Sequence, residues 1–179
     1  DRLVADTEIQ WYSRTQLLAN KCSFNFYTTT DFAVSSKATA DWSVISDWAY
    51  NANGDWFWVD GECEKQDLSK SLAQLFDHVQ RYAPLSVGIE VTGQQMGFIS
   101  IIRDMMMDKN IWFNFASNQK SGDPGIRPTT DKLLRFNTVV PWFKARKMYF
   151  PEELKHSRIM GIFMEQIRLA TKQGFKGKD

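Results

Sequence analysis

The sequence predicts an α/β domain with a mixed central sheet, in which three antiparallel strands are followed by parallel strands and helices flank the sheet. The first observation is a succession of aromatic and β-branched segments near the N-terminus with no helical segment between them. The second is that short apolar segments further along alternate with segments whose apolar residues recur every three or four positions, as in a helix. The third is a turn signal, Asn53-Gly54, between two of the opening strands.

The three opening strands are joined by short connections. They are expected at residues 24–34, 42–50 and 55–60. A turn of small residues at 35–40 separates the first two, and Asn53-Gly54 favours a two-residue hairpin because both residue types tolerate positive φ. Strands joined by such short turns pair antiparallel. We therefore expect a three-stranded meander.

The rest of the chain alternates helices with strands. Helices are expected at 68–82, 93–107, 129–136 and 151–173, and strands at 85–91, 110–116 and 147–150. A strand, helix and strand of these lengths imply parallel pairing through a right-handed crossover. Gly174 is expected to cap the last helix. A doubly wound dinucleotide fold is excluded, because it would alternate from the start and carry a Gly-rich first turn.

The length of 179 residues suits one domain. We expect residues 1–20 to form a linker or N-terminal helix and 21–179 to form the domain. Because Asp1 is not an initiator Met, we expect the chain to be a fragment that lacks a neighbouring domain. No apolar run approaches the roughly 20 residues that a membrane span needs, and no signal peptide is evident. Cys22 and Cys63 lack metal-site spacing, so we expect reduced thiols in an intracellular protein.

Charge and missing motifs narrow the function further. The formal net charge is +1, so any grip on nucleic acid must come from a local basic patch. The sequence has no phosphate-binding loop, which excludes ATP hydrolysis at such a loop. It also has no nucleophile elbow, which excludes a serine hydrolase that uses one. His78 and His156 fall in expected helices without a paired ligand, and we expect them to be satisfied or exposed side chains.

Two carboxylates end two of the predicted strands. Asp31 lies near the end of the first strand, and Glu90 lies at the end of the strand at 85–91, on the face opposite its apolar residues. Ligands of open α/β sheets gather at the carboxyl ends of strands. If these two strands are parallel neighbours, the acids are adjacent and repel unless they share a proton or a cation. With no candidate His or Cys ligands, the oxygen donors predict Mg²⁺ or Mn²⁺. Taken alone, Asp31 would also fit a strand end that faces water.

A two-metal site holds its ions roughly 4 Å apart and needs further acids. Asp179 is the candidate third ligand, and Asp131 competes with it but fits a helix N-terminal acid equally well. Asp41 either binds a metal-bound water or is a turn acid. Basic residues that suit phosphate contacts, or simply form a solvated surface, are Lys132, Arg135, Lys144, Arg146 and Lys147, with Lys172, Lys176 and Lys178 around Asp179.

The motifs together resemble the C-terminal nuclease domain of the large terminase subunit of tailed bacteriophages, which has a ribonuclease H-like fold. The matching segments, in chain order, are 29–33 (TTDFA), then Lys37 and 40–44 (ADWSV), 87–93 (VGIEVTG), 131–135 (DKLLR) and 174–179 (GFKGKD). The last segment is similar to the approach to the family's Asp-Asp-x-x-Asp motif, of which only the first Asp is present. The resemblance therefore leaves either Asp179 or a residue beyond it as the third ligand.

The resemblance implies a metal-dependent endodeoxyribonuclease that cuts concatemeric viral DNA during genome packaging. It implies Asp31, Glu90 and Asp179 as catalytic metal ligands assisted by Asp41, and DNA contacts from Lys132, Arg135, Lys178 and Lys37. The implied partners are double-stranded DNA, an ATPase domain on the same polypeptide, the small terminase subunit and the portal, in the host cytoplasm during virus assembly. Two alternatives stay open: another ribonuclease H-like nuclease of the junction resolvase or transposase type, and a non-catalytic DNA-binding or docking domain.

Overall fold

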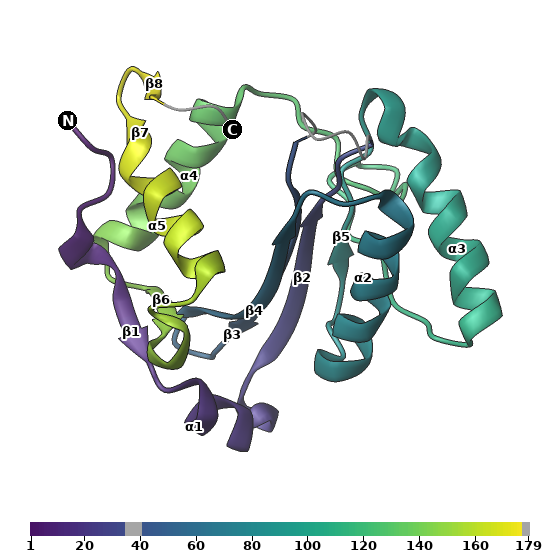
Figure 1. Cartoon of the computed structure of the whole chain (residues 1–179), viewed down its shortest axis with the longest axis horizontal. Coiled ribbons are helices and arrows are strands. Elements are labelled where there is room, and N and C mark those ends of the chain that lie inside the picture. The colour runs from purple at the N-terminus through teal and green to yellow at the C-terminus, as the bar shows by residue number, and fades with distance from the viewer. Residues whose placement is uncertain (35–40, 177–179) are drawn as a thin grey trace. The chain divides into compact units, whose positions relative to one another are not determined.

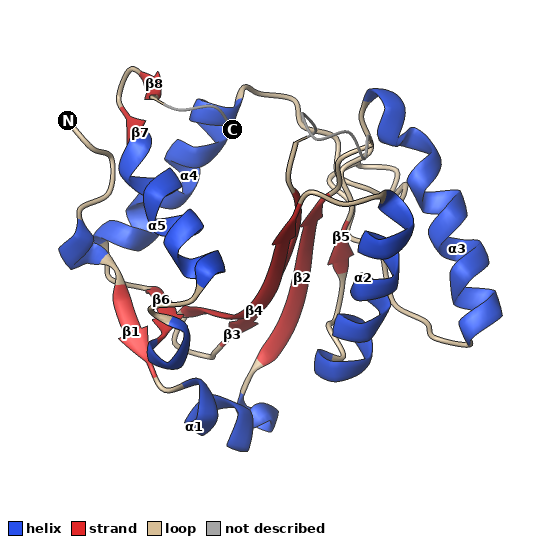
Figure 2. Ribbon diagram, viewed as in Figure 1, coloured by secondary structure: helices blue, strands red, loops and turns tan. Residues whose placement is uncertain are grey.

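A computed structural model describes residues 1–34 and 41–176 (Figures 1 and 2). Six strands form one sheet in the order β1-β6-β4-β3-β2-β5, and β7 and β8 form a small second sheet. The strands are β1 (Gln10–Tyr12), β2 (Asn25–Asp31), β3 (Ser43–Tyr50), β4 (Trp56–Glu64), β5 (Val87–Gly88), β6 (Met148–Pro151), β7 (Ala170–Thr171) and β8 (Gly174–Phe175). The helices are α1 (Arg14–Ala19), α2 (Leu68–Tyr82), α3 (Phe98–Lys109), α4 (Lys132–Lys144) and α5 (Arg158–Leu169). Short 3₁₀ helices are η1 (Asp6–Glu8), η2 (Lys21–Ser23), η3 (Gly93–Gly97) and η4 (Glu152–Leu154). The predicted mixed sheet is confirmed.

The opening meander is confirmed, since β2, β3 and β4 are neighbours in the sheet. Its hairpin turn differs from the prediction and spans residues 51–55 rather than two residues. The side chain of Asn51 accepts hydrogen bonds from the backbone N–H of Asn53 and of Asp55, and only Gly54 takes a positive φ, of 80°. The predicted turn is wrong because an Asn side chain can complete a wider turn by mimicking the backbone.

The chain divides into two compact units, and β3 and β4 contribute residues to both. The second unit comprises residues 25–48 and 60–128. Its core joins Phe32, which follows β2, and residues of β3 and β5 to the apolar stripe of α2 and to the inner side of α3. Helices α2 and α3 lie beside β5 in Figure 1. Helix α2 has the predicted bounds, because Asp67 caps its first turn by accepting from the backbone N–H of Lys70 at 2.9 Å.

The predicted strand at 85–91 forms a regular ladder only at β5. Residue Val87 bridges Phe115 in parallel, and Glu90 bridges Ile126, so the neighbouring segment changes halfway along the strand. The expected parallel pairing of 110–116 is therefore confirmed, although that segment forms an isolated bridge rather than a strand. The helix predicted at 93–107 begins as η3 and continues as α3 to Lys109.

The first unit comprises residues 1–24, 49–59 and 129–179, of which 177–179 lie outside the described residues. The expected N-terminal helix is present as α1, but it follows a strand that was not predicted. That strand, β1, pairs in parallel with β6, which also pairs in parallel with β4. The rings of Phe143 on α4 and Phe163 on α5 both contact Phe150 of β6, and this packing forms the unit's core. The domain boundary after residue 20 stays a prediction.

The helices of the first unit differ most from the prediction. Helix α4 runs to Lys144, past the expected end at residue 136, and includes Pro141. The single helix expected at 151–173 is wrong: η4 and α5 replace it, and Ser157 caps α5 by accepting from the backbone N–H of Met160. Gly174 has φ of 128° in the β7–β8 hairpin, so it is not a helix cap.

Within the described residues, no helix combines the length and the apolar character that crossing a membrane requires. Cys22 is exposed and Cys63 is buried, and neither forms a disulfide bond.

Candidate metal centre

The parallel pairing of β2 with β5 sets the geometry of the two predicted carboxylates. Thr28 pairs with Val87 and Thr29 with Gly88. Continuing this register by two residues on each strand brings Asp31 beside Glu90. The Thr30 hydroxyl donates to the carbonyl oxygen of Gly88 at 2.6 Å, which ties the strands together one residue before Asp31. Strands β2 and β5 are therefore parallel neighbours, which meets the condition for adjacent acids. Asp31 ends β2, and Glu90 lies two residues beyond β5.

The backbone around Glu90 is held on its other side by Ile126. The N–H of Ile126 donates to the carbonyl oxygen of Ile89 at 2.7 Å, and the N–H of Val91 donates to the carbonyl oxygen of Ile126 at 3.0 Å. Ile89 and Val91 are buried, whereas the Glu90 side chain is half-buried. The alternation of the strand thus turns Glu90 away from the core, as predicted.

Two residues that the sequence analysis missed lie next to these acids. The hydroxyl of Thr92 lies 3.4 Å from Oε1 of Glu90 and 3.2 Å from Oε1 of Gln95. The Nε2 of Gln95 donates to the carbonyl oxygen of Phe32, the residue after Asp31, at 3.0 Å. Thr92 lies in the segment 87–93 that carries the resemblance, whereas no sequence signal distinguished Gln95.

The other acids that the sequence suggested as metal ligands are not placed beside Asp31 and Glu90 by any described contact. Asp41 is exposed and lies two residues before the start of β3 at Ser43. Asp131 is the N-cap of α4 and accepts from the backbone N–H of Leu134 at 2.9 Å, so its interpretation as a helix N-terminal acid is confirmed. Lys37, Lys178 and Asp179 lie outside the described residues.

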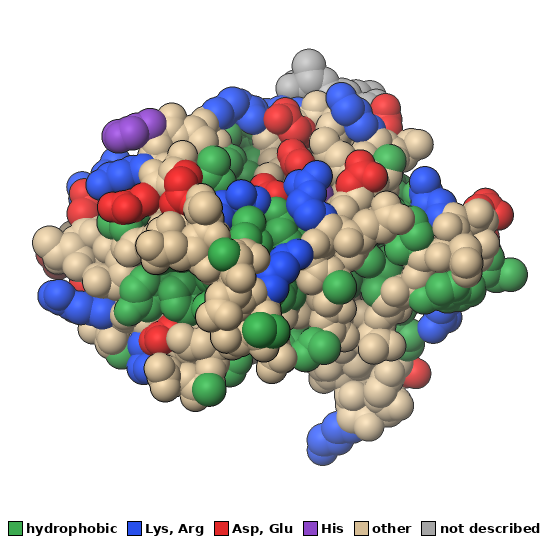
Figure 3. All heavy atoms as spheres, turned by 90° about the horizontal axis from the view of Figure 1, so that it is seen from below, with side chains coloured by type: hydrophobic (Ala, Val, Ile, Leu, Met, Phe, Trp, Pro, Cys, Tyr) green, Lys and Arg blue, Asp and Glu red, His purple; other side chains and the backbone are tan. Residues whose placement is uncertain are grey.

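Several residues of the predicted basic cluster make contacts with other residues of the first unit. Lys144 pairs with Glu8 at 2.8 Å, and Lys147 donates to the carbonyl oxygen of Asn53 at 2.9 Å. The Lys132 ammonium lies 5.2 Å from the ring centre of Phe175. On the face drawn in Figure 3, basic and acidic side chains are interspersed. Charge alone therefore does not mark a DNA-binding face there, and the predicted DNA contacts of Lys132 and Arg135 stay predictions.

A second group of titratable side chains lies inside the second unit, under α2. Asp47, Asp60 and His78 approach one another closely enough to surround an ion. His78 and Asp47 are buried, and they are hydrogen-bonded through Nδ1 and a carboxylate oxygen. The Nε2 of His78 lies 3.0 Å from Glu62, and Thr28 donates its hydroxyl proton to Asp47 at 2.7 Å. Both ring nitrogens therefore already face carboxylates.

These contacts decide the protonation of the His78 ring. Burial lowers the pKa of His78, but the hydrogen bond and charge of Asp47, with smaller contributions from Glu62 and Asp60, outweigh it and raise the pKa to about 9. The ring is an imidazolium held between carboxylates, and a metal ion there would have to displace its proton. The expectation that His78 is a satisfied side chain is confirmed.

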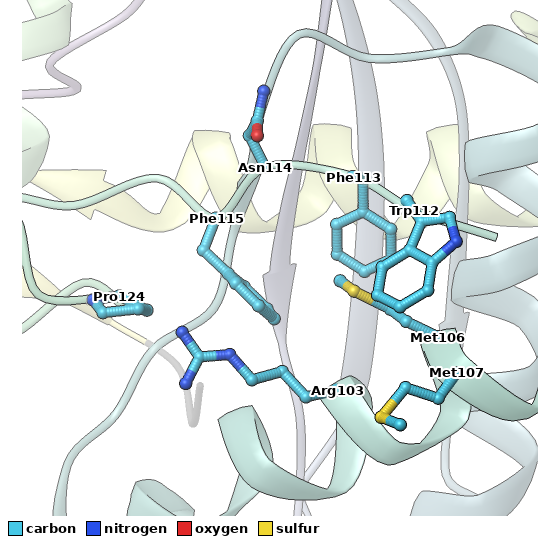
Figure 4. Close-up of a pocket in the computed structure, with 8 residues that line it drawn as sticks. All are labelled: Arg103, Met106, Met107, Trp112, Phe113, Asn114, Phe115 and Pro124. Atoms are coloured by element: carbon cyan, nitrogen blue, oxygen red, sulfur yellow. The ribbon is translucent and has the colours of Figure 1, made fainter. Parts of the chain in front are cut away.

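A pocket of about 450 Å³ lies between α3 and the residues that follow it (Figure 4). Its lining is Arg103, Met106, Met107, Trp112, Phe113, Asn114, Phe115 and Pro124. The Arg103 guanidinium lies 5.7 Å from the ring centre of Phe115, and Trp112 is largely exposed. The lining offers no carboxylate, so this pocket does not supply metal ligands.

Several solved structures share this fold. The human cytomegalovirus terminase nuclease domain, Mn-soaked and inhibitor-bound, matches with a TM-score of 0.66 and 13% identity over 95% of this chain and 86% of that chain. The Mn-soaked form of that domain gives 0.60 and 11% identity over 96% and 89%. The large terminase nuclease from the thermophilic phage G20c with bound cobalt gives 0.53 and 13% identity over 88% and 75%. No protein-family model and no curated protein matches the sequence. At these identities the likeness establishes the fold, and the predicted ribonuclease H-like architecture is confirmed.

Proposed function

We propose that the chain is a metal-dependent DNA endonuclease, the nuclease of a terminase that cuts concatemeric viral DNA during genome packaging. The observation that carries this proposal is the parallel register of β2 and β5. Continued by two residues beyond the ladder, this register aligns Asp31 with Glu90. Support comes from the fold, which is that of solved terminase nuclease domains from human cytomegalovirus and phage G20c.

The chemistry of the two side chains fits a hard divalent cation. Adjacent carboxylates repel unless a cation or a proton lies between them, and their oxygen atoms are the donors that Mg²⁺ and Mn²⁺ prefer. Asp31 is exposed and Glu90 half-buried, so an ion reaches both from solvent. Two such ions, held by Asp31 and Glu90, would stabilise the charge on the cleaved phosphate and activate the attacking water. The similar structures were soaked with Mn or hold cobalt, which supports a divalent ion in this fold.

The remaining assignments rest on the sequence resemblance. Asp179 is proposed as the third ligand, Asp41 as an acid that orients a bound water, and Lys132, Arg135, Lys178 and Lys37 as contacts to the phosphate backbone of double-stranded DNA. An ATPase domain on the same polypeptide, the small terminase subunit and the portal are the proposed partners, and the host cytoplasm the proposed location.

The central experiment is cleavage of a supercoiled plasmid in Mn²⁺ or Mg²⁺ by the wild type and by Asp31→Asn and Glu90→Gln. We expect each substitution to lower the cleavage rate at least about 100-fold, because each removes an anionic metal ligand. Asp77→Asn is the matched control, since Asp77 is an exposed acid on α2 of the same unit. Cleavage by Asp31→Asn at the wild-type rate would overturn the proposal.

The same assay tests the third ligand. We expect Asp179→Asn to lose cleavage while Asp131→Asn keeps it, because Asp131 already caps α4. A melting curve for each variant separates lost catalysis from lost folding. Full activity in Asp179→Asn would move the third ligand to another residue and leave the pair Asp31 and Glu90 in place.

Two further measurements separate the alternatives. Preferential cutting of four-way junctions over duplex plasmid, or strand transfer, is the outcome that favours a resolvase or transposase. Calorimetry in which Mn²⁺ and Mg²⁺ do not bind while DNA does is the outcome that favours a non-catalytic DNA-binding domain. We expect metal binding in the wild type and cleavage of ordinary duplex.

A further inference from the structure

We infer that Thr92 and Gln95 are positioning residues that hold Asp31 and Glu90 in one mutual arrangement, an inference that rests on the proposed nuclease function. Both residues belong to the turn that follows Glu90, and η3 begins there. They make hydrogen bonds toward both acid-bearing strands. The sequence motifs that identified the acids do not include Gln95.

Gln95 anchors the chain just after Asp31. Its Nε2 donates to the carbonyl oxygen of Phe32 at 3.0 Å. The Phe32 ring is buried and contacts Phe98 edge-on, with ring centres 6.1 Å apart, so this residue is also fixed to the first turn of α3. The backbone that leaves Asp31 is thus tied to the turn after Glu90 by a polar and an apolar contact.

The orientation of the Gln95 amide follows from its partner. A carbonyl oxygen only accepts, so the amide must present its NH₂ group to Phe32 and its oxygen to the other side. On that side lies the hydroxyl of Thr92, 3.2 Å from Oε1 of Gln95. The N–H of Gln95 also donates to the carbonyl oxygen of Thr92 at 2.9 Å, which fixes the distance between the two side chains.

The Thr92 hydroxyl connects this anchor to Glu90. It lies 3.4 Å from Oε1 of Glu90, and its single proton is shared between the carboxylate and the Gln95 oxygen. A charged acceptor forms the stronger bond, so the proton favours Glu90. One carboxylate oxygen of Glu90 is thereby held by Thr92.

Such contacts act on the metal ligands and leave the reacting atoms untouched. A pair of acids must be held within about 0.5 Å of the productive geometry to bind two ions correctly. Removing the hydrogen bonds that orient a metal ligand typically costs 10–100-fold in metal affinity or activity. The expected signature is therefore weaker Mn²⁺ binding and a lower kcat, with unchanged KM for DNA and little change in folding, because Thr92 is exposed and Gln95 half-buried.

The test compares Thr92→Val and Gln95→Met, which keep side-chain size and remove the hydrogen bonds, with Thr92→Ser, which keeps the hydroxyl. Gln80→Met is the matched control, since Gln80 is exposed on α2. Calorimetry with Mn²⁺ alone, plasmid cleavage and thermal melting are measured for each protein. We expect Thr92→Val and Gln95→Met to weaken Mn²⁺ binding 10–100-fold, and Thr92→Ser and Gln80→Met to stay within about threefold of the wild type.

The outcomes separate this inference from the proposed function. Wild-type Mn²⁺ affinity and kcat in both Thr92→Val and Gln95→Met, with or without a lower melting temperature, would show that the residues are only structural and overturn the inference alone. A wild type that binds no Mn²⁺ and cuts no DNA would overturn the inference together with the proposed function. Weaker binding with unchanged melting supports both.

Discussion

At the scale of single residues, Asp47 shows how a buried charge is kept in the sheet. Strand β3 alternates buried and half-buried residues, and Asp47 falls on the buried face with Ser43, Ile45 and Ala49. A carboxylate at such a position is costly unless it is paired. His78 from α2 pairs with it, and among the described residues every buried side-chain polar atom has a hydrogen-bond partner. The sequence analysis did not single out Asp47, and only the fold shows that His78 is its partner.

The raised pKa of His78 predicts a loss of stability in alkaline solution. The folded-state pKa of about 9 exceeds the ordinary histidine pKa of 6.5, so the stabilisation is complete below pH 6.5 and is lost as the pH rises through 9. The size of the shift corresponds to roughly 3 kcal/mol. Urea unfolding followed between pH 6 and pH 10 should show this loss in the free energy of unfolding.

His78→Gln provides the comparison for that pH dependence. This variant is expected to be less stable at pH 6, because the buried Asp47 loses its cationic partner. Its free energy of unfolding should lack the decline between pH 6.5 and pH 9 that the wild type shows. Parallel pH profiles for the two proteins would show that His78 is neutral in the folded state.

At the scale of elements, the strand that ends in Glu90 depends on a glycine in another segment. Gly125 has φ of 102°, and a Cβ there would lie 2.5 Å from a methyl carbon of Val91. The missing side chain lets residues 125–126 lie against the end of the strand, where Ile126 bonds to Ile89 and Val91. Apolar alternation predicted the strand, but it gave no information about which segment would border it.

Gly125→Ala is therefore expected to destabilise the protein by roughly 2–4 kcal/mol, from the strained φ together with the clash against Val91. Gly122→Ala is the matched control, because Gly122 also has positive φ, of 76°, but a Cβ there meets nothing within 4 Å. The control should cost about 1 kcal/mol. Equal losses in the two variants, measured by chemical unfolding, would show that packing on Val91 contributes nothing.

The single helix predicted at 151–173 is wrong for a physical reason. The apolar spacing at 151–173 is helical in part, but Pro151 extends β6 and the Glu153 carboxylate accepts from the backbone N–H groups of Arg14 and Thr15. That carboxylate caps α1, a contact between residues 138 and 139 positions apart in the sequence. Local periodicity carries no information on such distant partners, whereas α2, with its cap and stripe both local, was predicted to the residue.

At the scale of the whole molecule, the order of elements was enough to predict the ribonuclease H-like sheet. A meander followed by strand, helix and strand leaves few topologies, because crossovers are right-handed and short turns pair neighbours. The same order put Asp31 and Glu90 at the ends of strands that prove to be parallel neighbours. Strand β1 was not predicted, because three residues are too few to show the apolar and polar alternation of a strand. Its partner β6 also lies more than 130 positions away in the sequence.

A functional site that gathers like charges is expected to lower stability until a ligand arrives. In EDTA, Asp31→Asn should therefore melt at a higher temperature than the wild type, because it removes one of two neighbouring carboxylates. Adding Mn²⁺ to 100 times its dissociation constant should stabilise the wild type by about 2.7 kcal/mol, or roughly 5–10 °C in melting temperature. The same addition should leave Asp31→Asn unchanged. Calorimetric scans of the two proteins with and without Mn²⁺ measure both effects, and a wild type that melts alike in EDTA and in Mn²⁺ would show that these carboxylates do not hold the ion.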